Sequence, residues 1–412
     1  MKPILKSIYP YLFLFFCFLL PLDKYATAAP NIALIVMLIT FPFVVKKSDF
    51  KKLLRVELYL FLGLLIYVTI NSIVFQEAAR DMVIIKKIAS AILLVVLYIP
   101  LEKTENLQKT IIISVLVCIL ISLYNMYWFY LQEGVFNFSA GLAIKDVLII
   151  DRLYLGFLCI ISIIASMVLI GKKYSKYNTW YFTNIVLCIG FVLLISSRVA
   201  IILLLVLFFL KIFYAKKKKQ YLFFFFGIAI LIITAFSLNK NLMERFFYTQ
   251  TKDKTQNYIE LFARWEPRVV IWECNYRIAK DKEYLTKGLG FYHVKDLLVD
   301  CYKDVVKREK RQIFFIESRY NSHSQFADFL LSTGIIGVLL FLGIFITLIR
   351  KRRRDFFSTG LIVSLFFFAI IESFFHRQLG AYYFSIIVIF LLFTKTNPNK
   401  KNQENQKIQS GF

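Results

Sequence analysis

A histidine at the junction of a polar segment and an apolar run is the first candidate for chemistry. His323 is one of only three histidines in 412 residues, and a long apolar run begins just after it. A neutral imidazole accepts a proton near neutral pH, and histidine is the residue that most often removes a proton from a reacting group. We therefore predict that His323 is a general base that deprotonates a sugar hydroxyl, with Asp328 as a residue that could orient it. A purely structural histidine is the alternative.

Two arginines are candidates for binding an anionic group. Arg198 follows two serines that interrupt a nearly continuous apolar stretch, and a charge at that depth usually faces a partner or a water-filled cavity. Arg268 follows Pro267 at a predicted helix start, where backbone N–H groups add to its charge. The planar guanidinium suits phosphate oxygens. The alternatives are a headgroup anchor or ion pair for Arg198 and a surface role for Arg268, which its neighbour Arg264 could replace.

A second polar group is predicted on the same side. Glu372 and His376 are four positions apart, so on one helix they would share a face, with Arg377 beside them. We assign Glu372, Arg377, Arg264 and the loop residue Arg152 to substrate binding. His293 is interpreted as structural.

The sequence carries no motif typical of a metal or nucleotide site. It has no HExxH, no CxxC, no tight cluster of acidic residues, no P-loop and no nucleotide-binding glycine motif. We therefore expect no metal, no cofactor and no ATP-driven machine.

The composition is that of a membrane protein. Hydrophobic residues make up 59% of the chain, the mean hydropathy is +0.65 and there are 44 phenylalanines. A formal charge of +25 would favour nucleic acid in a soluble protein, but in a membrane protein it is typical of basic cytoplasmic loops. Nucleic-acid binding is not expected.

We predict an all-α polytopic membrane protein with about twelve transmembrane helices, because apolar runs of roughly 18 residues can cross ~30 Å of hydrocarbon. The predicted spans are approximately 7–22, 29–45, 54–74, 83–100, 110–131, 153–170, 181–195, 199–214, 221–237, 326–349, 356–374 and 381–394.

The connecting loops alternate in charge along the chain. Loops of one set hold basic clusters such as 46–52, 216–219 and 350–354, whereas those of the other set hold one or two basic residues each. The positive-inside rule then places both termini in the cytoplasm and the largest loop outside. The predicted division is 1–237 with helices one to nine, 238–325 as an outer helical loop, 326–394 with helices ten to twelve, and 395–412 as a disordered cytoplasmic tail.

The first span and the cysteines leave two alternatives open. A basic start, an apolar core and Ala26–Ala28 would also fit a cleaved signal peptide, although Pro21 and Lys24 fit a short outer turn of a retained span. Four cysteines lie in apolar runs. Cys274 and Cys301 share the outer loop and could form a disulfide there if the loop faces an oxidising space.

The outer loop is predicted to form a small helical lid. A helix is expected from Pro267, with Trp265, Val269, Trp272 and Tyr276 on one face, and the glycines after Lys287 end it. A second amphipathic helix follows, with apolar residues at helical spacing from Val294 to Val305.

Four short motifs follow one another between about residues 185 and 345. They are Ser197–Ala200 at the opening of an apolar span, Arg268–Glu273 with an aromatic residue before the glutamate, Gly288–Phe291 with its Gly-x-Gly turn, and His323–Ser324 separated by nine residues from Gly334–Gly337. In this order and spacing they resemble the O-antigen ligase and O-antigen polymerase superfamily of bacterial inner-membrane glycosyltransferases.

The resemblance implies a metal-independent transfer in the periplasm by a multi-pass protein of the bacterial inner membrane. The donor would be a glycan on undecaprenyl pyrophosphate, and the acceptor a sugar hydroxyl of lipid A–core or of another glycan. At the positions that match the motifs of this superfamily, the resemblance implies that Arg198 and Arg268 hold the pyrophosphate and stabilise its developing charge, and that His323 activates the acceptor hydroxyl.

The interpretation is therefore an O-antigen ligase-like glycosyltransferase. A polymerase of polysaccharide repeat units is the runner-up, and a protein O-oligosaccharyltransferase comes third. A lipid-linked glycan transporter would predict charged residues in the middle of the membrane and inverted repeats, and the sequence shows neither. A purely structural membrane protein is the last alternative.

Overall fold

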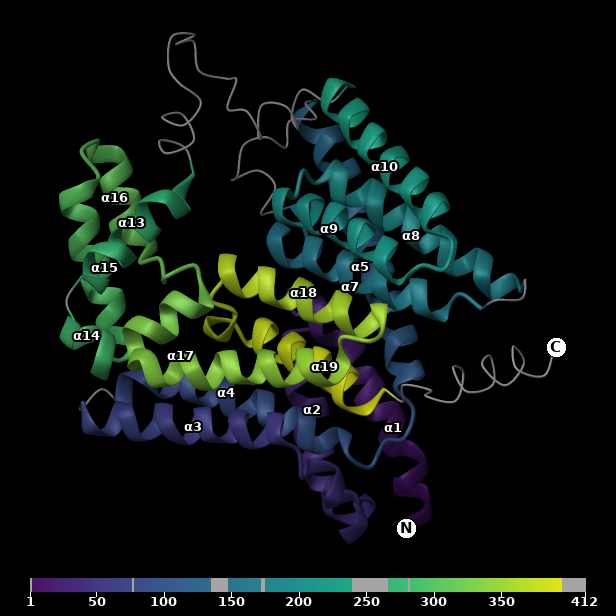
Figure 1. Ribbon diagram of the computed structural model, residues 1–412, viewed down its shortest axis with the longest axis horizontal. Helices are drawn as coiled ribbons and strands as arrows, with labels where there is room; N and C mark the ends of the chain where they lie inside the picture. Colours follow the sequence, from purple (N-terminus) through teal and green to yellow (C-terminus); the bar gives the residue numbers. More distant parts are fainter. Residues whose placement is uncertain are drawn as a thin grey trace, which may run out of the picture.

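The protein is all helical over the part of the chain that the structure describes, with no strand in those residues (Figure 1). The computed structural model describes residues 2–75, 78–134, 147–171, 175–238, 266–280 and 282–394. The helices of the main bundle are α1 (Lys2–Leu19), α2 (Ala29–Val44), α3 (Val56–Val74), α4 (Ala78–Tyr98), α5 (Thr104–Glu133), α7 (Arg152–Leu169), α8 (Lys176–Leu194), α9 (Arg198–Tyr214), α10 (Lys218–Leu238), α17 (Gln325–Arg352), α18 (Phe356–Ile371) and α19 (Gln378–Phe393). Short 3-10 turns are η1 (Leu20–Leu22), η2 (Lys47–Leu53) and η3 (Phe374–His376).

Each of the twelve predicted spans overlaps one of these helices, but the number of membrane crossings is not confirmed. By length and composition, six helices of the described residues could cross a membrane, or seven if α2 and η2, which meet at 119°, form one bent span. Helices α18 and α19 are apolar but shorter than 18 residues, and α4 carries several charged residues in its first half.

In its described residues the bundle buries a large apolar core, with a small second cluster between α5, α7 and α8, and leaves apolar residues on its outside. Helix α17 lies along α3, α19 lies along α4, and α7 packs against α8. Aliphatic and aromatic side chains such as Ile66, Phe182 and Leu339 are more than 40% exposed. An apolar exterior of this extent matches hydrocarbon rather than water, so the chain is a membrane protein.

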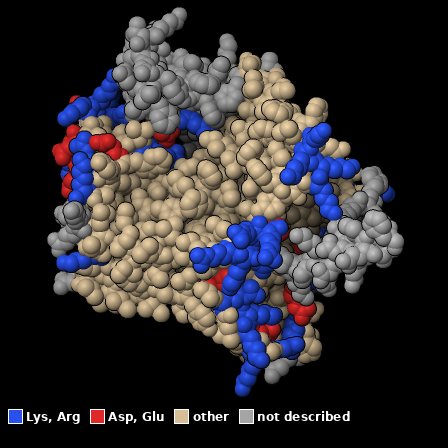
Figure 2. Space-filling model, in the orientation of Figure 1, with Lys and Arg blue, Asp and Glu red and all other residues tan. Residues whose placement is uncertain are grey.

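Among the described residues, some loops of the same predicted set contact each other at an end of the bundle. At one end Lys52 donates to the carbonyl oxygen of Ile99 and Arg352 donates to that of Thr394. At the other end Arg377 pairs with Asp151 beneath the large loop. Figure 2 shows a broad uncharged surface between charged residues at the left and clusters of Lys and Arg at the right and below the centre.

In its described residues, 266–280 and 282–325, the large loop forms a lid of four helices at the left of Figure 1, α13 (Pro267–Ala279), α14 (Lys282–Lys287), α15 (Phe291–Val305) and α16 (Glu309–Ser318). Its small core includes Val294 and Leu298 of the predicted amphipathic helix. A disulfide joins Cys274 and Cys301, whose Cα atoms are 5.8 Å apart. Helix α13 buries Val270, Ile271 and Cys274 against α15, so the face that carries Trp272 and Tyr276 is exposed.

Main-chain contacts fasten the lid to α17. The backbone N–H groups of Leu289 and Gly290 donate to the carbonyl oxygens of Leu331 and Ser332, at 2.9 and 2.8 Å. Gly334 (φ 70°, ψ −171°) breaks the helix there. A Cβ on Gly288 would lie 2.6 Å from the Ser332 carbonyl oxygen, and one on Gly334 would lie 2.4 Å from that of Thr286. The glycines of two separate motifs therefore permit one close backbone contact.

Candidate functional site

The segment that carries His323 is fixed in an uncommon backbone conformation. His323 has φ +43°, in the left-handed region that costs a non-glycine residue of order 1–3 kcal/mol. The Asn321 side chain accepts its backbone N–H at 3.0 Å, and the Trp272 indole donates to its carbonyl oxygen at 3.3 Å. Asn275 of the lid donates to the carbonyl oxygen of Ser322 at 2.9 Å. The lid thus holds the conformation that aims the imidazole.

The partner of the His323 ring is Glu372. Its Oε2 lies 3.2 Å from Nδ1 of His323, and the carboxylate is 3% exposed. Burial opposes its ionisation, but the hydrogen bond from His323 and the charges of His323, Arg377 and Arg268 outweigh burial and hold the pKa of Glu372 below its ordinary value. An ionised carboxylate only accepts, so Nδ1 of His323 carries a proton, and in the neutral ring Nε2 then keeps its lone pair.

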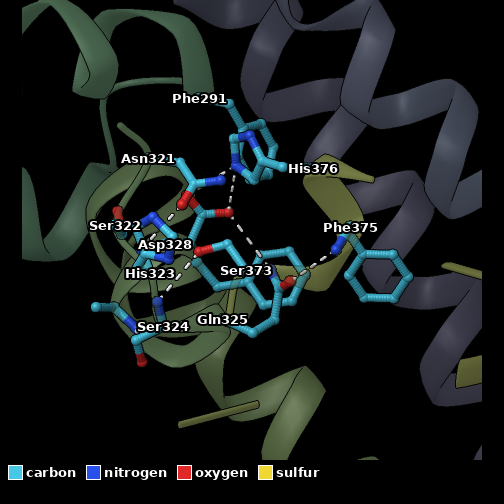
Figure 3. A network of polar contacts seen from close by, with 12 residues as sticks. Phe291, Asn321, Ser322, His323, Ser324, Gln325, Asp328, Ser373, Phe375 and His376 are labelled. Carbon is cyan, nitrogen blue, oxygen red and sulfur yellow. Dashed lines mark hydrogen bonds and ion pairs between the residues drawn. The ribbon is translucent and has the colours of Figure 1, made fainter. Parts of the chain in front are cut away.

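The expectation that Asp328 orients His323 is wrong, because Asp328 binds His376 instead. Nε2 of His376 lies 2.9 and 3.0 Å from the two oxygens of Asp328, which is 2% exposed. Figure 3 shows that the segments 321–328 and 373–376 face each other. Gln325 accepts the backbone N–H of Phe375, and Ser373 accepts that of Ser324.

Glu372 and His376 do not share a helix, contrary to the prediction. Helix α18 ends at Ile371, and Glu372 follows it in an extended conformation before η3. The chain turn then directs the two side chains to different partners on the opposing segment. The result is two crossed histidine–carboxylate pairs, His323 with Glu372 and His376 with Asp328.

A glutamate joins the two predicted anion-binding arginines. Nη1 of Arg198 lies 2.7 Å from one Glu266 oxygen, and Nη1 of Arg268 lies 3.0 Å from the other. Arg198 begins α9 and Arg268 lies in the first turn of α13, so the pair connects the bundle to the lid. Arg268 also donates through Nε to the carbonyl oxygen of Ile371, next to Glu372. The two arginines and His323 are therefore gathered at one end of the bundle.

The remaining predicted residues are distributed around this centre. Arg377 pairs with Asp151 at 3.0 Å and lies over the Tyr154 ring. Arg152 is buried at the start of α7 and is not among the residues that line the cavity described next. Arg264 lies outside the described residues.

A cavity of about 360 Å³ opens on the side of His323 that faces α4 and α15. Its lining includes His323, Glu372, His376 and five cationic side chains, which are Arg80, Lys87, Lys295, Arg319 and Arg377. Tyr292 and Tyr320 add aromatic rings, the second with its centroid 5.4 Å from the His323 ring.

Sequence reasoning missed most of these cations and also Glu266. Lys87 and Arg80 were visible as basic residues near the start of an apolar run, but their contact with the lid depends on α4 packing against α15. Glu266 precedes Pro267 at the helix start that the sequence identified, and its bond to Arg198 spans 68 positions.

Among the described side chains, no three His, Cys, Asp or Glu residues come together as a metal site would require. The polar centre consists instead of paired cations and carboxylates, and the imidazoles of His323 and His376 line the cavity beside them. This arrangement can hold anionic oxygens and can accept a proton from a bound hydroxyl.

A comparison with protein-family models finds a match that includes this polar centre in part. The O-antigen ligase family model matches residues 183–342, a segment that contains Arg198, the lid and His323. The predicted resemblance to the O-antigen ligase superfamily is thereby confirmed over that segment, and it supports ligase- or polymerase-type glycan transfer in a membrane as the general function. None of the curated proteins compared with the chain matches it.

Proposed function

We propose that the protein is an O-antigen ligase-like glycosyltransferase, which moves a glycan from undecaprenyl pyrophosphate to a sugar hydroxyl of lipid A–core. The observation that carries the proposal is the contact of Nδ1 of His323 with buried Glu372, 3.2 Å away, beside the Arg198–Glu266–Arg268 group. A base and two guanidinium groups in one place are the elements that a glycosyl transfer from a phosphate leaving group requires.

The donor phosphates would bind at Arg198 and Arg268. Both guanidinium groups are held by Glu266, and Arg268 is also fixed by the Ile371 carbonyl oxygen, so their positions are set before a substrate arrives. A planar fork of donors stabilises negative charge as it accumulates on the leaving oxygen. Arg152, Arg264 and Arg377 remain proposed contacts to substrate.

The acceptor hydroxyl would be activated by Nε2 of His323. As its oxygen forms a bond to C1 of the donor sugar, the bond from C1 to the pyrophosphate oxygen breaks and the hydroxyl proton passes to Nε2. The electron pair leaves with undecaprenyl pyrophosphate. Glu372 would stabilise the imidazolium that forms, so we propose a positioning role for it in addition to a place in the substrate cavity.

The reaction would take place on the periplasmic side of the bacterial inner membrane. The basic loops at the end remote from the lid support a cytoplasmic position for that end and for both termini. The disulfide between Cys274 and Cys301 supports an oxidising surrounding for the lid.

The experiment that tests the proposal is complementation of a deletion strain with His323→Ala. We expect normal membrane insertion and no glycan transfer, whereas His293→Ala, a lid histidine that does not line the cavity, should complement. Transfer retained in His323→Ala would refute the base assignment.

A gel of the surface glycans of the deletion strain distinguishes a ligase from a polymerase of repeat units. Loss of all glycan-capped lipid means a ligase, and lipid that carries a single repeat unit means a polymerase.

A further inference from the structure

The cavity beside His323 is distinct from the arginine group that we assign to the donor. Its lining includes His323 and Glu372 but neither Arg198, Arg268 nor Glu266. The His323 imidazole therefore lines the cavity, whereas Arg268 does not. Arg268 is held next to Glu372 by its hydrogen bond to the Ile371 carbonyl oxygen. A hydroxyl that enters the cavity can reach the base without displacing the donor phosphates.

Positive charge dominates the cavity. Its lining carries five cationic side chains and two carboxylates, Asp81 and Glu372. The carboxylates are already engaged: Asp81 accepts the backbone N–H groups of Phe291 and Tyr292 at 3.0 and 2.8 Å, and Glu372 binds His323. Three of the five cations are paired with carboxylates outside the lining, Arg80 and Arg319 with Asp296 and Arg377 with Asp151.

Two of the cations have no carboxylate within 4.0 Å in the described part of the chain. Lys87 of α4 donates to the carbonyl oxygen of His376, and Lys295 of α15 has no ion pair there. Burial lowers the pKa of Lys295, which means that its charged form is held in an unfavourable place. A bound anion between these two lysines would relieve that cost.

The remaining lining suits a sugar. Arg80 lies over the Tyr292 ring, with its guanidinium carbon 4.1 Å from the centroid, and Tyr320 lies next to the His323 ring. Aromatic faces with a few convergent polar groups are typical of small-molecule sites, whose volumes run from roughly 300 to 1,000 Å³. At about 360 Å³ the cavity falls in this range.

We propose that this cavity is the acceptor site and that it selects a glycan with an acidic group, a carboxylate or a phosphate, near its reacting hydroxyl. The inference rests on the proposed function, because it is the transfer reaction that makes the ligand an acceptor. Lys87 and Lys295 bind the acidic group, and the hydroxyl faces Nε2 of His323.

Direct binding tests the proposal without requiring transfer. The full chain in nanodiscs is titrated with three fluorescent oligosaccharides, one with a hexuronic acid, one with a phosphorylated sugar, and the carboxyl-reduced neutral counterpart of the first. We expect an acidic probe to bind roughly tenfold more tightly than the neutral one, the size of one charge-assisted hydrogen bond. The acidic probe that binds more tightly identifies the group.

Matched variants locate the effect. Lys295→Gln and Lys87→Gln should each abolish or sharply reduce the preference for the acidic probe. Lys303→Gln, an exposed charge on the same helix as Lys295, and Lys86→Gln, the exposed neighbour of Lys87, should retain it. Unfolding temperatures of the four variants establish that each is folded, and two independent cavity variants keep the test decisive if one is not.

Two results would overturn the proposal. They are equal affinity of the wild-type chain for acidic and neutral probes, and a preference for the acidic probe that survives in both cavity variants. Failure of the proposed function is a separate outcome. Glycan transfer by His323→Ala would refute the role of His323 as the base, but it would not change the measured preference for the acidic probe.

Discussion

Replacing Glu372 by glutamine is the sharpest perturbation of the proposed chemistry, because it removes one charge from a buried pair and little volume. Nδ1 of His323 and Oε2 of Glu372 are 3.2 Å apart, and the carboxylate is 3% exposed. At an effective dielectric of about 20, unit charges at this separation attract by about 5 kcal/mol. If the ring carries half a charge in the transition state, the loss is about 2.5 kcal/mol, or roughly 70-fold in rate.

The loss in Glu372→Gln grows if the amide N–H donates to Nδ1. That contact places the ring proton on Nε2, where the base must be unprotonated, and the wrong tautomer costs about 10⁴-fold in a comparable arrangement. We therefore expect kcat to fall by between about 10² and 10⁴, with KM values near those of the wild-type chain, because Glu372 acts through His323.

The assay is transfer by purified protein in nanodiscs, with a lipid-linked glycan donor and a defined acceptor, and with kcat and both KM values determined. Glu309→Gln, an exposed carboxylate on the lid, is the control and should match the wild type. A near-normal kcat for Glu372→Gln, together with an inactive His323→Ala, would refute the idea that the carboxylate orients and charges the imidazole.

Three further predictions concern the arginines, the lid and acid stability. Arg198→Lys should lower kcat/KM for the donor by roughly tenfold or more, because an ammonium lacks the fork that spans carboxylate and phosphate oxygens; Arg308→Lys on the lid surface should not. Gly288→Ala should lower the unfolding free energy by more than about 2 kcal/mol, because its φ of +76° and a backbone atom at 2.6 Å both oppose a Cβ; Gly190→Ala, where no atom lies within 4 Å, should not. Because the folded state holds the pKa of Glu372 low, its ionised form stabilises the fold above its ordinary pKa, and this contribution is lost as the pH falls through the lowered value. The difference in unfolding temperature between wild type and Glu372→Gln should therefore shrink below about pH 4.5.

Each of these has a distinct contrary outcome. Full activity of Arg198→Lys would mean that a point charge suffices, as it would for a headgroup anchor. A Gly288→Ala chain as stable as Gly190→Ala would mean that the lid is not fastened at that point. A difference in unfolding temperature that goes on widening below about pH 4.5 would mean that the folded state raises the pKa of Glu372 instead of lowering it.

The helices and the positions of three residues of the candidate site could be predicted because each leaves a local trace in the sequence. Long apolar runs identify the helices, and Arg198, Arg268 and His323 were found where polar residues interrupt or border such runs. The lid helices were found from a proline start and a repeat of apolar residues, which the structure confirms for α13 and α15.

The partners of those residues leave no local trace. Glu372 reaches His323 across 49 positions only because α18 ends at Ile371, and a helix continued through His376 would have turned it elsewhere. The buried face of α13 is likewise set by Cys274, which must meet Cys301 of α15. Tyr276 lies on the opposite, exposed face of α13, where its hydroxyl group can bind water.

The way the lid is fastened has a consequence for how such a protein can change. Its seam with α17 is formed by backbone N–H and carbonyl groups at Leu289, Gly290, Leu331 and Ser332, which every amino acid other than proline supplies in the same form. Side chains elsewhere on the lid can therefore be exchanged without changing these backbone hydrogen bonds to α17. A lid transplanted from another chain, provided that it keeps Gly288 and Gly290, should therefore bind α17 in the same place and replace Lys295 by its own residue at that point of the cavity wall.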